Sequence, residues 1–167
     1  DVGTFSQTNY YIDTPQFDLK ANQSALRIRV KDDYNEMTLK IPAEVGLMEY
    51  NFETRVVPEL NKSITTQMLP AEIIEQLEKM DFDLNQLVIL GALTTERLEK
   101  EVNGNLLVLD KSEYLNKVDY ELEFEVDSYN EGYEKFKQLL QEFDIKHKKP
   151  LNKVQRFFEE KKKASDK

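Results

Sequence analysis

Cysteine is absent from this 167-residue chain, and histidine occurs once. The missing thiols exclude disulfides and thiolate-bound metals, so carboxylate oxygens are the main donors left for a metal ion. The five glycines form no glycine-rich loop of the kind that holds phosphate through backbone amides. Any phosphate would therefore have to be recognised by side chains.

Long hydrophobic runs are missing as well. No apolar stretch approaches the roughly 18 residues that cross a bilayer, and no hydrophobic signal segment begins the chain, so we expect a cytoplasmic protein without a membrane partner. The net charge of −9 argues against general nucleic-acid binding, although a basic site inside an acidic shell is compatible with it. The length suits a single domain over 1–167, which we expect to be a monomer or a homodimer.

Alternation of polar and apolar residues predicts a series of antiparallel strands. The candidates lie at 8–13, 25–30, 37–41, 51–57, 94–102, 105–110 and 119–126, together with the opening segment. The Asn-Gly-Asn turn at 103–105 predicts a hairpin, because Asn-Gly accepts the positive φ that such turns need. The pattern indicates a meander.

Helical spacing of apolar residues appears at 70–80, 128–145 and 151–163. Proline at position 70 suits the first turn of the first of these helices. The last one continues into charged sequence, and we expect 160–167 to be a frayed basic tail. Three amphipathic helices need an apolar surface to cover.

Each predicted strand has one polar or charged face and one apolar face. Because successive side chains point to opposite faces, Arg27 and Arg29 share one face, as do Glu121 and Glu123. A solvated sheet also alternates, but it usually mixes the signs of its charges, whereas here paired arginines come early and stacked glutamates late. We therefore expect an α+β protein: an antiparallel, closed or nearly closed β-barrel with a charged interior and helices packed on the outside.

Such an interior suits a polyphosphate together with a metal ion. Guanidinium groups bind phosphate oxygens bidentately, so a basic wall would hold the ligand. Carboxylates repel phosphate unless a divalent cation lies between them. The carboxylate row at 119–126 therefore predicts Mg²⁺ or Mn²⁺, with arginine beyond it.

Several segments, taken in order, resemble the CYTH family, also called triphosphate tunnel metalloenzymes, and in particular its small stand-alone bacterial branch. They are TNYYIDT, ALRIRV, MTLKIP, ETR, TTER, LVLD and DYELEFEV, and the likeness runs from about Thr8 to Phe157. The resemblance implies an eight-stranded antiparallel tunnel that binds a triphosphate with a divalent metal. In most members of the family this tunnel hydrolyses the terminal phosphoanhydride.

The resemblance also implies roles for individual residues. The phosphate ligands would be Arg27, Arg29, Lys40, Arg55, Arg97, Lys153 and Arg156. The metal ligands would be Glu121 and Glu123, which form the catalytic set with Lys40; the supporting residues would be Glu53, Asp110 and Glu125. Lys153 and Arg156 belong to a motif of the last helix, which closes one mouth of the tunnel.

Two features depart from the family pattern. Its first strand, Glu-x-Glu-x-Lys, is not found in this chain, and we expect that strand upstream in the full gene product. Glu99 stands two positions after Arg97, where many relatives have a further base. Affinity or substrate choice would differ accordingly.

The leading functional hypothesis is a metal-dependent triphosphatase that acts on inorganic triphosphate or a small organic triphosphate. One alternative is an adenylyl cyclase that makes cyclic AMP from ATP, although the sequence offers no clear adenine pocket. Another is a non-catalytic module that binds a polyphosphate. The mutual repulsion of Glu121 and Glu123 adds an expectation: removing either carboxylate should leave or raise stability without metal and lower metal affinity.

Overall fold

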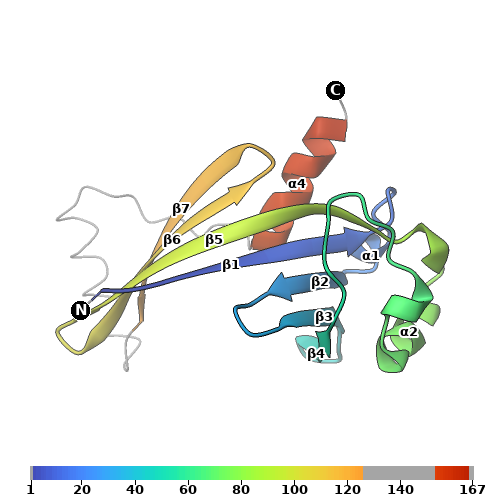
Figure 1. Ribbon diagram of the computed structural model, residues 1–167, viewed down its shortest axis with the longest axis horizontal. Coiled ribbons are helices and arrows are strands. Elements are labelled where there is room, and N and C mark those ends of the chain that lie inside the picture. The colour runs from blue at the N-terminus through green and yellow to red at the C-terminus, as the bar shows by residue number, and fades with distance from the viewer. Residues whose placement is uncertain (1, 126–152, 166–167) are drawn as a thin grey trace. The chain divides into compact units, whose positions relative to one another are not determined.

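The computed structural model describes residues 2–125 and 153–165 (Figure 1). The predicted helix at 128–145 lies outside the described residues. The chain forms two compact units, one comprising Gln7–Thr94 and the other Asp1–Ser6 together with Thr95–Lys167.

The described strands form one seven-stranded sheet in the order β4-β3-β2-β1-β5-β6-β7. Their bounds are β1 Val2–Asp13, β2 Ala25–Val30, β3 Asn35–Pro42, β4 Leu47–Thr54, β5 Val88–Val102, β6 Asn105–Tyr114 and β7 Lys117–Glu125. The pairings of β1 with β2, β2 with β3, β3 with β4 and β6 with β7 are antiparallel, as predicted. The resemblance implies eight strands. Within residues 2–125 and 153–165, seven are present, and no backbone pairing joins the edge strands β4 and β7.

The predicted hairpin at 103–105 is confirmed between β5 and β6. Asn103 and Gly104 have φ values of 51° and 79°, in the left-handed region that this dipeptide tolerates. A second two-residue turn joins β6 to β7 at Leu115 and Asn116, with φ values of 46° and 66°. These short turns fix the register of the hairpins.

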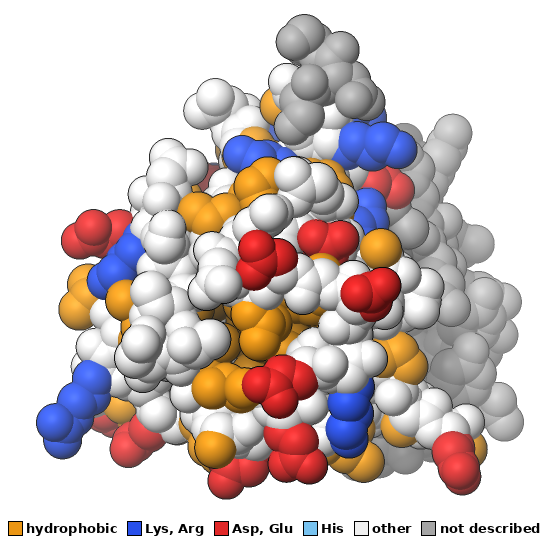
Figure 2. Space-filling model, turned by 90° about the vertical axis from the view of Figure 1, so that its right-hand side faces the viewer, with side chains coloured by type: hydrophobic (Ala, Val, Ile, Leu, Met, Phe, Trp, Pro, Cys, Tyr) orange, Lys and Arg blue, Asp and Glu red, His pale blue; other side chains and the backbone are white. Residues whose placement is uncertain are grey.

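One apolar core holds the unit Gln7–Thr94 together. Helices α1 (Asp18–Ala21) and α2 (Ala71–Glu78), with the short 3-10 helices η1 (Thr66–Met68) and η2 (Leu84–Gln86), connect its strands. The buried cluster contains Ile12, Leu19, Leu26, Ile28, Met37, Leu39, Ile64, Leu69, Ile73, Leu77, Leu87 and Ile89. The cluster draws on α1, α2 and the apolar faces of the strands, so helices cover the apolar side of the sheet here, as predicted. Figure 2 shows a surface on which acidic side chains surround a hydrophobic area, in keeping with the net charge of −9.

In the second unit, polar side chains of the sheet are buried. On β6, Asp110 and Ser112 are each 1% exposed, whereas Leu109 between Val108 and Asp110 is 37% exposed. Tyr120 on β7 is 67% exposed. The helix α4 (Lys153–Ser165) contributes Lys153 and Arg156, which contact Asp110 and Asp119 on the polar face of this hairpin.

Helix α4 confirms the described part, 153–163, of the helix predicted at 151–163 and extends it to Ser165. The segment 160–165, for which the charge run predicted fraying, is thus helical. Phe157 and Phe158 of α4 are both buried, and their rings meet edge to face with centroids 5.3 Å apart. No described helix is both long and apolar enough to cross a membrane.

The core position of Leu77 predicts a large loss of stability on truncation. Leu77→Ala should lower the free energy of unfolding by about 2–5 kcal/mol, because it removes apolar burial and leaves a cavity. Glu75→Ala on the exposed side of α2 should change it by less than about 0.5 kcal/mol. Urea denaturation measures both, and equal effects would contradict the assignment of the core.

Candidate functional site

Arg27 and Arg29 lie on the polar face of β2, in the unit Gln7–Thr94. Leu26 and Ile28, which alternate with them, are fully buried in the core. The neighbours in register with the arginines on β1 and β3 are Asn9, Tyr11, Glu36 and Thr38. Side chains in register on adjacent strands share a face, so the arginines are set among polar groups.

Arg27 makes no ion pair within the part of the chain that the structure describes, although Glu49 and Glu36 act on its charge at longer range. Its Nε is buried and has no hydrogen-bond partner among the described residues. Burial, and then the neighbouring Arg29, lower the pKa of Arg27. A buried cation without a partner is costly, and a bound anion would relieve that cost.

Arg29 and Lys40, two further predicted bases of this unit, each have a polar partner. Arg29 donates from Nε to Asn9 Oδ1 over 2.9 Å. Lys40 forms an ion pair with Glu49 at 3.3 Å, and hydrogen bonding by Lys40 is the main cause of the lowered pKa of Glu49. Both side chains are more than a third exposed, so this pair contributes little stability and leaves Lys40 able to turn to another anion.

Arg55 and Glu53, at the end of β4, both have exposed side chains. The predicted strand 51–57 ends at Thr54, because its partner β3 begins at Asn35, the residue opposite Thr54. Arg55 therefore follows the strand, and its side chain is exposed. Glu53 is also exposed and lies opposite Glu36. Their roles as phosphate ligand and supporting residue stay predictions.

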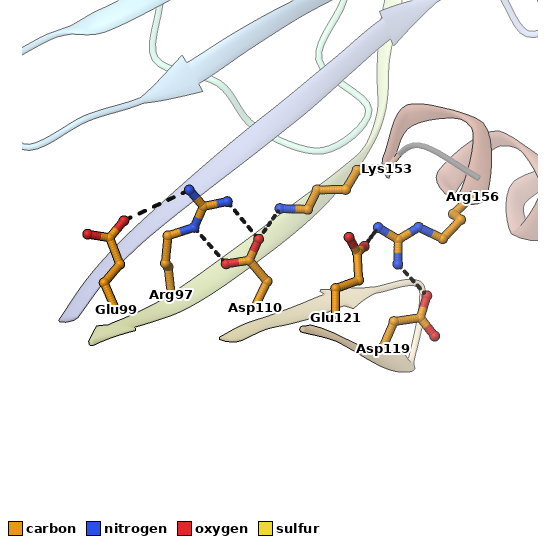
Figure 3. A network of polar contacts seen from close by, with 7 residues as sticks. All are labelled: Arg97, Glu99, Asp110, Asp119, Glu121, Lys153 and Arg156. Carbon is orange, nitrogen blue, oxygen red and sulfur yellow. Dashed lines mark hydrogen bonds and ion pairs between the residues drawn. The ribbon is translucent and has the colours of Figure 1, made fainter. Parts of the chain in front are cut away.

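In the second unit, Asp110 is held between two cations (Figure 3). Arg97 donates from Nε and Nη2 to the two carboxylate oxygens over 2.7 and 2.8 Å, and Lys153 Nζ lies 3.1 Å from Oδ2. Burial raises the pKa of Asp110, but the hydrogen bonds from Arg97 and Lys153 outweigh burial, so that the pKa lies below its ordinary value. Asp110 thus orients Arg97 and Lys153, two of the predicted phosphate ligands, and its supporting role toward a substrate stays a prediction.

The glutamate row on β7 meets a different cation (Figure 3). Arg156 on α4 contacts Asp119 Oδ2 from Nη1 over 3.2 Å and Glu121 Oε1 from Nη2. Glu123 is exposed and makes no ion pair in the part of the chain that the structure describes, and the side chain of Glu125 lies outside that part. The positive group that faces the row is therefore Arg156, and the expectation of uncompensated repulsion no longer applies to Glu121.

A family model of the CYTH domain matches residues 1–158. The chain belongs to the CYTH family. A Bacillus subtilis (strain 168) protein named "Putative triphosphatase YjbK" is 42% identical over 158 residues, which cover 95% of this chain and 82% of that protein. The predicted family is thereby confirmed, and membership implies a divalent metal ion.

Two solved structures share the fold of this CYTH domain. A Bacillus halodurans protein, described as a putative adenylate cyclase, is 33% identical with a TM-score of 0.63, over 93% of this chain and 83% of that one. The Hippeastrum protein HpAC1, described as a putative adenylyl cyclase with a dominant triphosphatase activity, is 21% identical with a TM-score of 0.62, over 94% and 83% of the two chains. The second likeness concerns the fold alone.

The carboxylates of β7 suit a divalent metal in this CYTH domain. Mg²⁺ is commonly bound by one or two carboxylates, with water and substrate phosphates as its other ligands. Glu123 has no competing partner among residues 2–125 and 153–165, and Glu121 becomes available if it leaves Arg156. These described residues contain no group of three potential ligands, so the fit rests on the two glutamates.

Four polar residues of the second unit were not predicted as site residues. Tyr114 donates its hydroxyl to Asp119 over 2.5 Å, and the hydroxyl oxygens of Thr95 and Ser112 are buried without a partner among the described residues. Asp119 was visible in the alternating carboxylate row. Thr95 belongs to the TTER segment of the family resemblance. Tyr114 and Ser112 needed the register of the β6–β7 hairpin, because nothing in their local sequence marks them.

The clamp on Asp110 predicts a pH-dependent stability difference. Asp110→Asn should lower the free energy of unfolding at pH 7 by about 1–3 kcal/mol, because it weakens hydrogen bonds from two charged donors. Since the folded-state pKa of Asp110 lies below its ordinary value of 3.8, the wild-type advantage is present above that pH and is lost as pH falls through the folded pKa. Urea unfolding of both proteins between pH 7 and pH 2.5 tests this, and a difference that grows on acidification would contradict it.

The two glutamates of β7 should differ in their effect on metal-free stability. Glu121→Gln should lower the free energy of unfolding by about 1–2 kcal/mol through its weakened bond to Arg156. Glu123→Gln should leave it unchanged or raise it, since Glu123 is exposed beside other carboxylates. Thermal and urea unfolding in EDTA compare the variants; the reverse order would contradict the pairing of Arg156 with Glu121.

Proposed function

We propose that this CYTH domain hydrolyses the terminal phosphoanhydride bond of inorganic triphosphate or a small organic triphosphate, with Mg²⁺ or Mn²⁺ as cofactor. The observation that carries the proposal is the buried Nε of Arg27, which has no hydrogen-bond partner among the described residues and lies beside a second arginine, Arg29. A polyanion compensates such a pair better than a neutral ligand would. The 42% identity to the Bacillus subtilis protein named as a putative triphosphatase supports the same reaction.

Phosphoryl transfer to water requires positioning and charge neutralisation more than covalent chemistry. In the proposal, Arg27, Arg29 and Lys40 bind phosphate oxygens. Arg97, Lys153 and Arg156, each of which is oriented by a carboxylate, are proposed as further phosphate ligands. A divalent ion, when bound, would neutralise charge between phosphate oxygens and the carboxylates of Glu121 and Glu123.

Cyclisation of ATP is the second candidate reaction, because a structure that is 33% identical is described as a putative adenylate cyclase. The two reactions differ in their products. Hydrolysis of ATP gives ADP and phosphate, whereas cyclisation gives cyclic AMP and diphosphate. Separation of the products by anion-exchange chromatography distinguishes them.

The full-length protein should release phosphate from tripolyphosphate when Mg²⁺ or Mn²⁺ is present. Arg27→Met should lower kcat/KM by about a hundredfold or more, because a preorganised donor to the phosphate is lost. Its free energy of unfolding should stay the same or rise, since the substitution removes a buried Nε that has no hydrogen-bond partner among the described residues.

Lys79→Met is the control, because it removes a positive charge from an exposed position at the end of α2. It should leave phosphate release unchanged. Binding of tripolyphosphate without turnover would instead favour the non-catalytic module, and cyclic AMP as the main product from ATP would favour the cyclase.

A further inference from the structure

Arg97 and Arg156 use their guanidinium groups differently (Figure 3). In Arg97, Nε and Nη2, which form the edge that binds an oxyanion bidentately, are both occupied by Asp110. In Arg156, Nη2 contacts Glu121, but Nε is buried and has no partner among the described residues. The bidentate edge of Arg156 is therefore only half used.

Glu121 occupies the other half of that edge. It is also one of the two carboxylates that suit a divalent cation. If Glu121 turns from Arg156 to a cation, Nε and Nη2 of Arg156 become available together for one phosphate group. Nη1 remains with Asp119, on the other side of the guanidinium.

Asp119 is fixed from a second direction by Tyr114. The phenol donates to Oδ2 over 2.5 Å, and Tyr114 is 4% exposed. Burial, and then the hydrogen bond to Asp119, raise the pKa of Tyr114, so the hydroxyl keeps its proton and stays a donor. Asp119 pairs with Ser112 in register, whereas Tyr114 pairs with Lys117, so Tyr114 reaches Asp119 diagonally across the hairpin.

We propose that Asp119, held by Tyr114, is the positioning residue that keeps Arg156 in place while Glu121 exchanges this arginine for a divalent cation. The freed edge of Arg156 then binds a phosphate oxygen of the substrate. The identity of that anion rests on the proposed function, but the geometry that distinguishes Asp119 from Glu121 does not. Cation and phosphate each favour binding of the other, because both require Glu121 to leave Arg156.

Asp119→Asn and Glu121→Gln form a matched pair, since each removes one negative charge from the same face of β7. If only charge mattered, both variants would bind a polyanion more tightly. If the contacts only attach α4, both would alter stability without altering affinity. The proposal instead requires opposite effects on tripolyphosphate affinity in metal-free buffer.

The experiment is isothermal titration of the full-length protein with tripolyphosphate, first in EDTA and then with Mg²⁺. Asp119→Asn should weaken binding about tenfold in both buffers, because Arg156 loses its fixed partner. Glu121→Gln should strengthen binding in EDTA, because it releases the Nη2 half of the edge, and should lose most of the gain that Mg²⁺ gives the wild type. Glu113→Gln, on the exposed face of β6, should change nothing.

Tyr114→Phe keeps the ring in place and tests the same idea if Asp119→Asn fails to fold. Its affinity for tripolyphosphate should fall about threefold, while Mn²⁺ binding measured alone by electron paramagnetic resonance should stay unchanged. Unchanged or tighter tripolyphosphate binding by a folded Asp119→Asn or Tyr114→Phe overturns the inference. A wild type that neither binds nor cleaves tripolyphosphate overturns the proposed function itself.

Discussion

The unit that contains the acidic strand depends on the compensation of one buried carboxylate. Asp110 is 1% exposed, and such a charge is tolerated only because Arg97 and Lys153 donate to both of its oxygens. The same contacts hold α4 against the polar face of β6 and give Arg97 a fixed orientation. Asp110 can therefore be buried only when Arg97 and Lys153 are held in place beside it.

In the other unit, by contrast, a charged group has one buried nitrogen that lacks a partner in the described part of the chain. Arg27 is half-buried beside Arg29, and no acid meets its Nε within the described residues. The apolar core on the other side of β2 fixes the strand that carries both arginines, and its burial offsets the cost of the unsatisfied Nε. A protein keeps such an arrangement when an anion completes it, which agrees with the proposed binding of a triphosphate by this CYTH domain.

The carboxylates of the acidic face contact their arginines in different ways. Asp110 takes the whole bidentate edge of Arg97, whereas Asp119 and Glu121 divide Arg156 and leave its Nε unused. Equal charges on one strand can therefore have different contacts among the described residues: Asp119 is fixed by Tyr114 and Arg156, Glu121 contacts Arg156 alone, and Glu123 is exposed. Our proposal assigns the exchange of arginine for a cation to Glu121. Residue type and spacing cannot assign these roles.

Local sequence determined the strands, the hairpin at Asn103 and Gly104, the segregation of arginines from glutamates and the CYTH resemblance, because alternation and turn chemistry act over a few residues. Tertiary structure decided which residue pairs with each charged side chain. Arg156 lies 35 residues from Glu121 in the sequence, and Asp110 lies 43 from Lys153, so no local pattern could predict these pairs. Strand ends also depended on partners: β4 stops before Arg55 because β3 offers no residue opposite it. The alternation of nearby residues determines which side chains share a strand face. The oppositely charged residues that pair with them belong to distant segments, which only folding brings together.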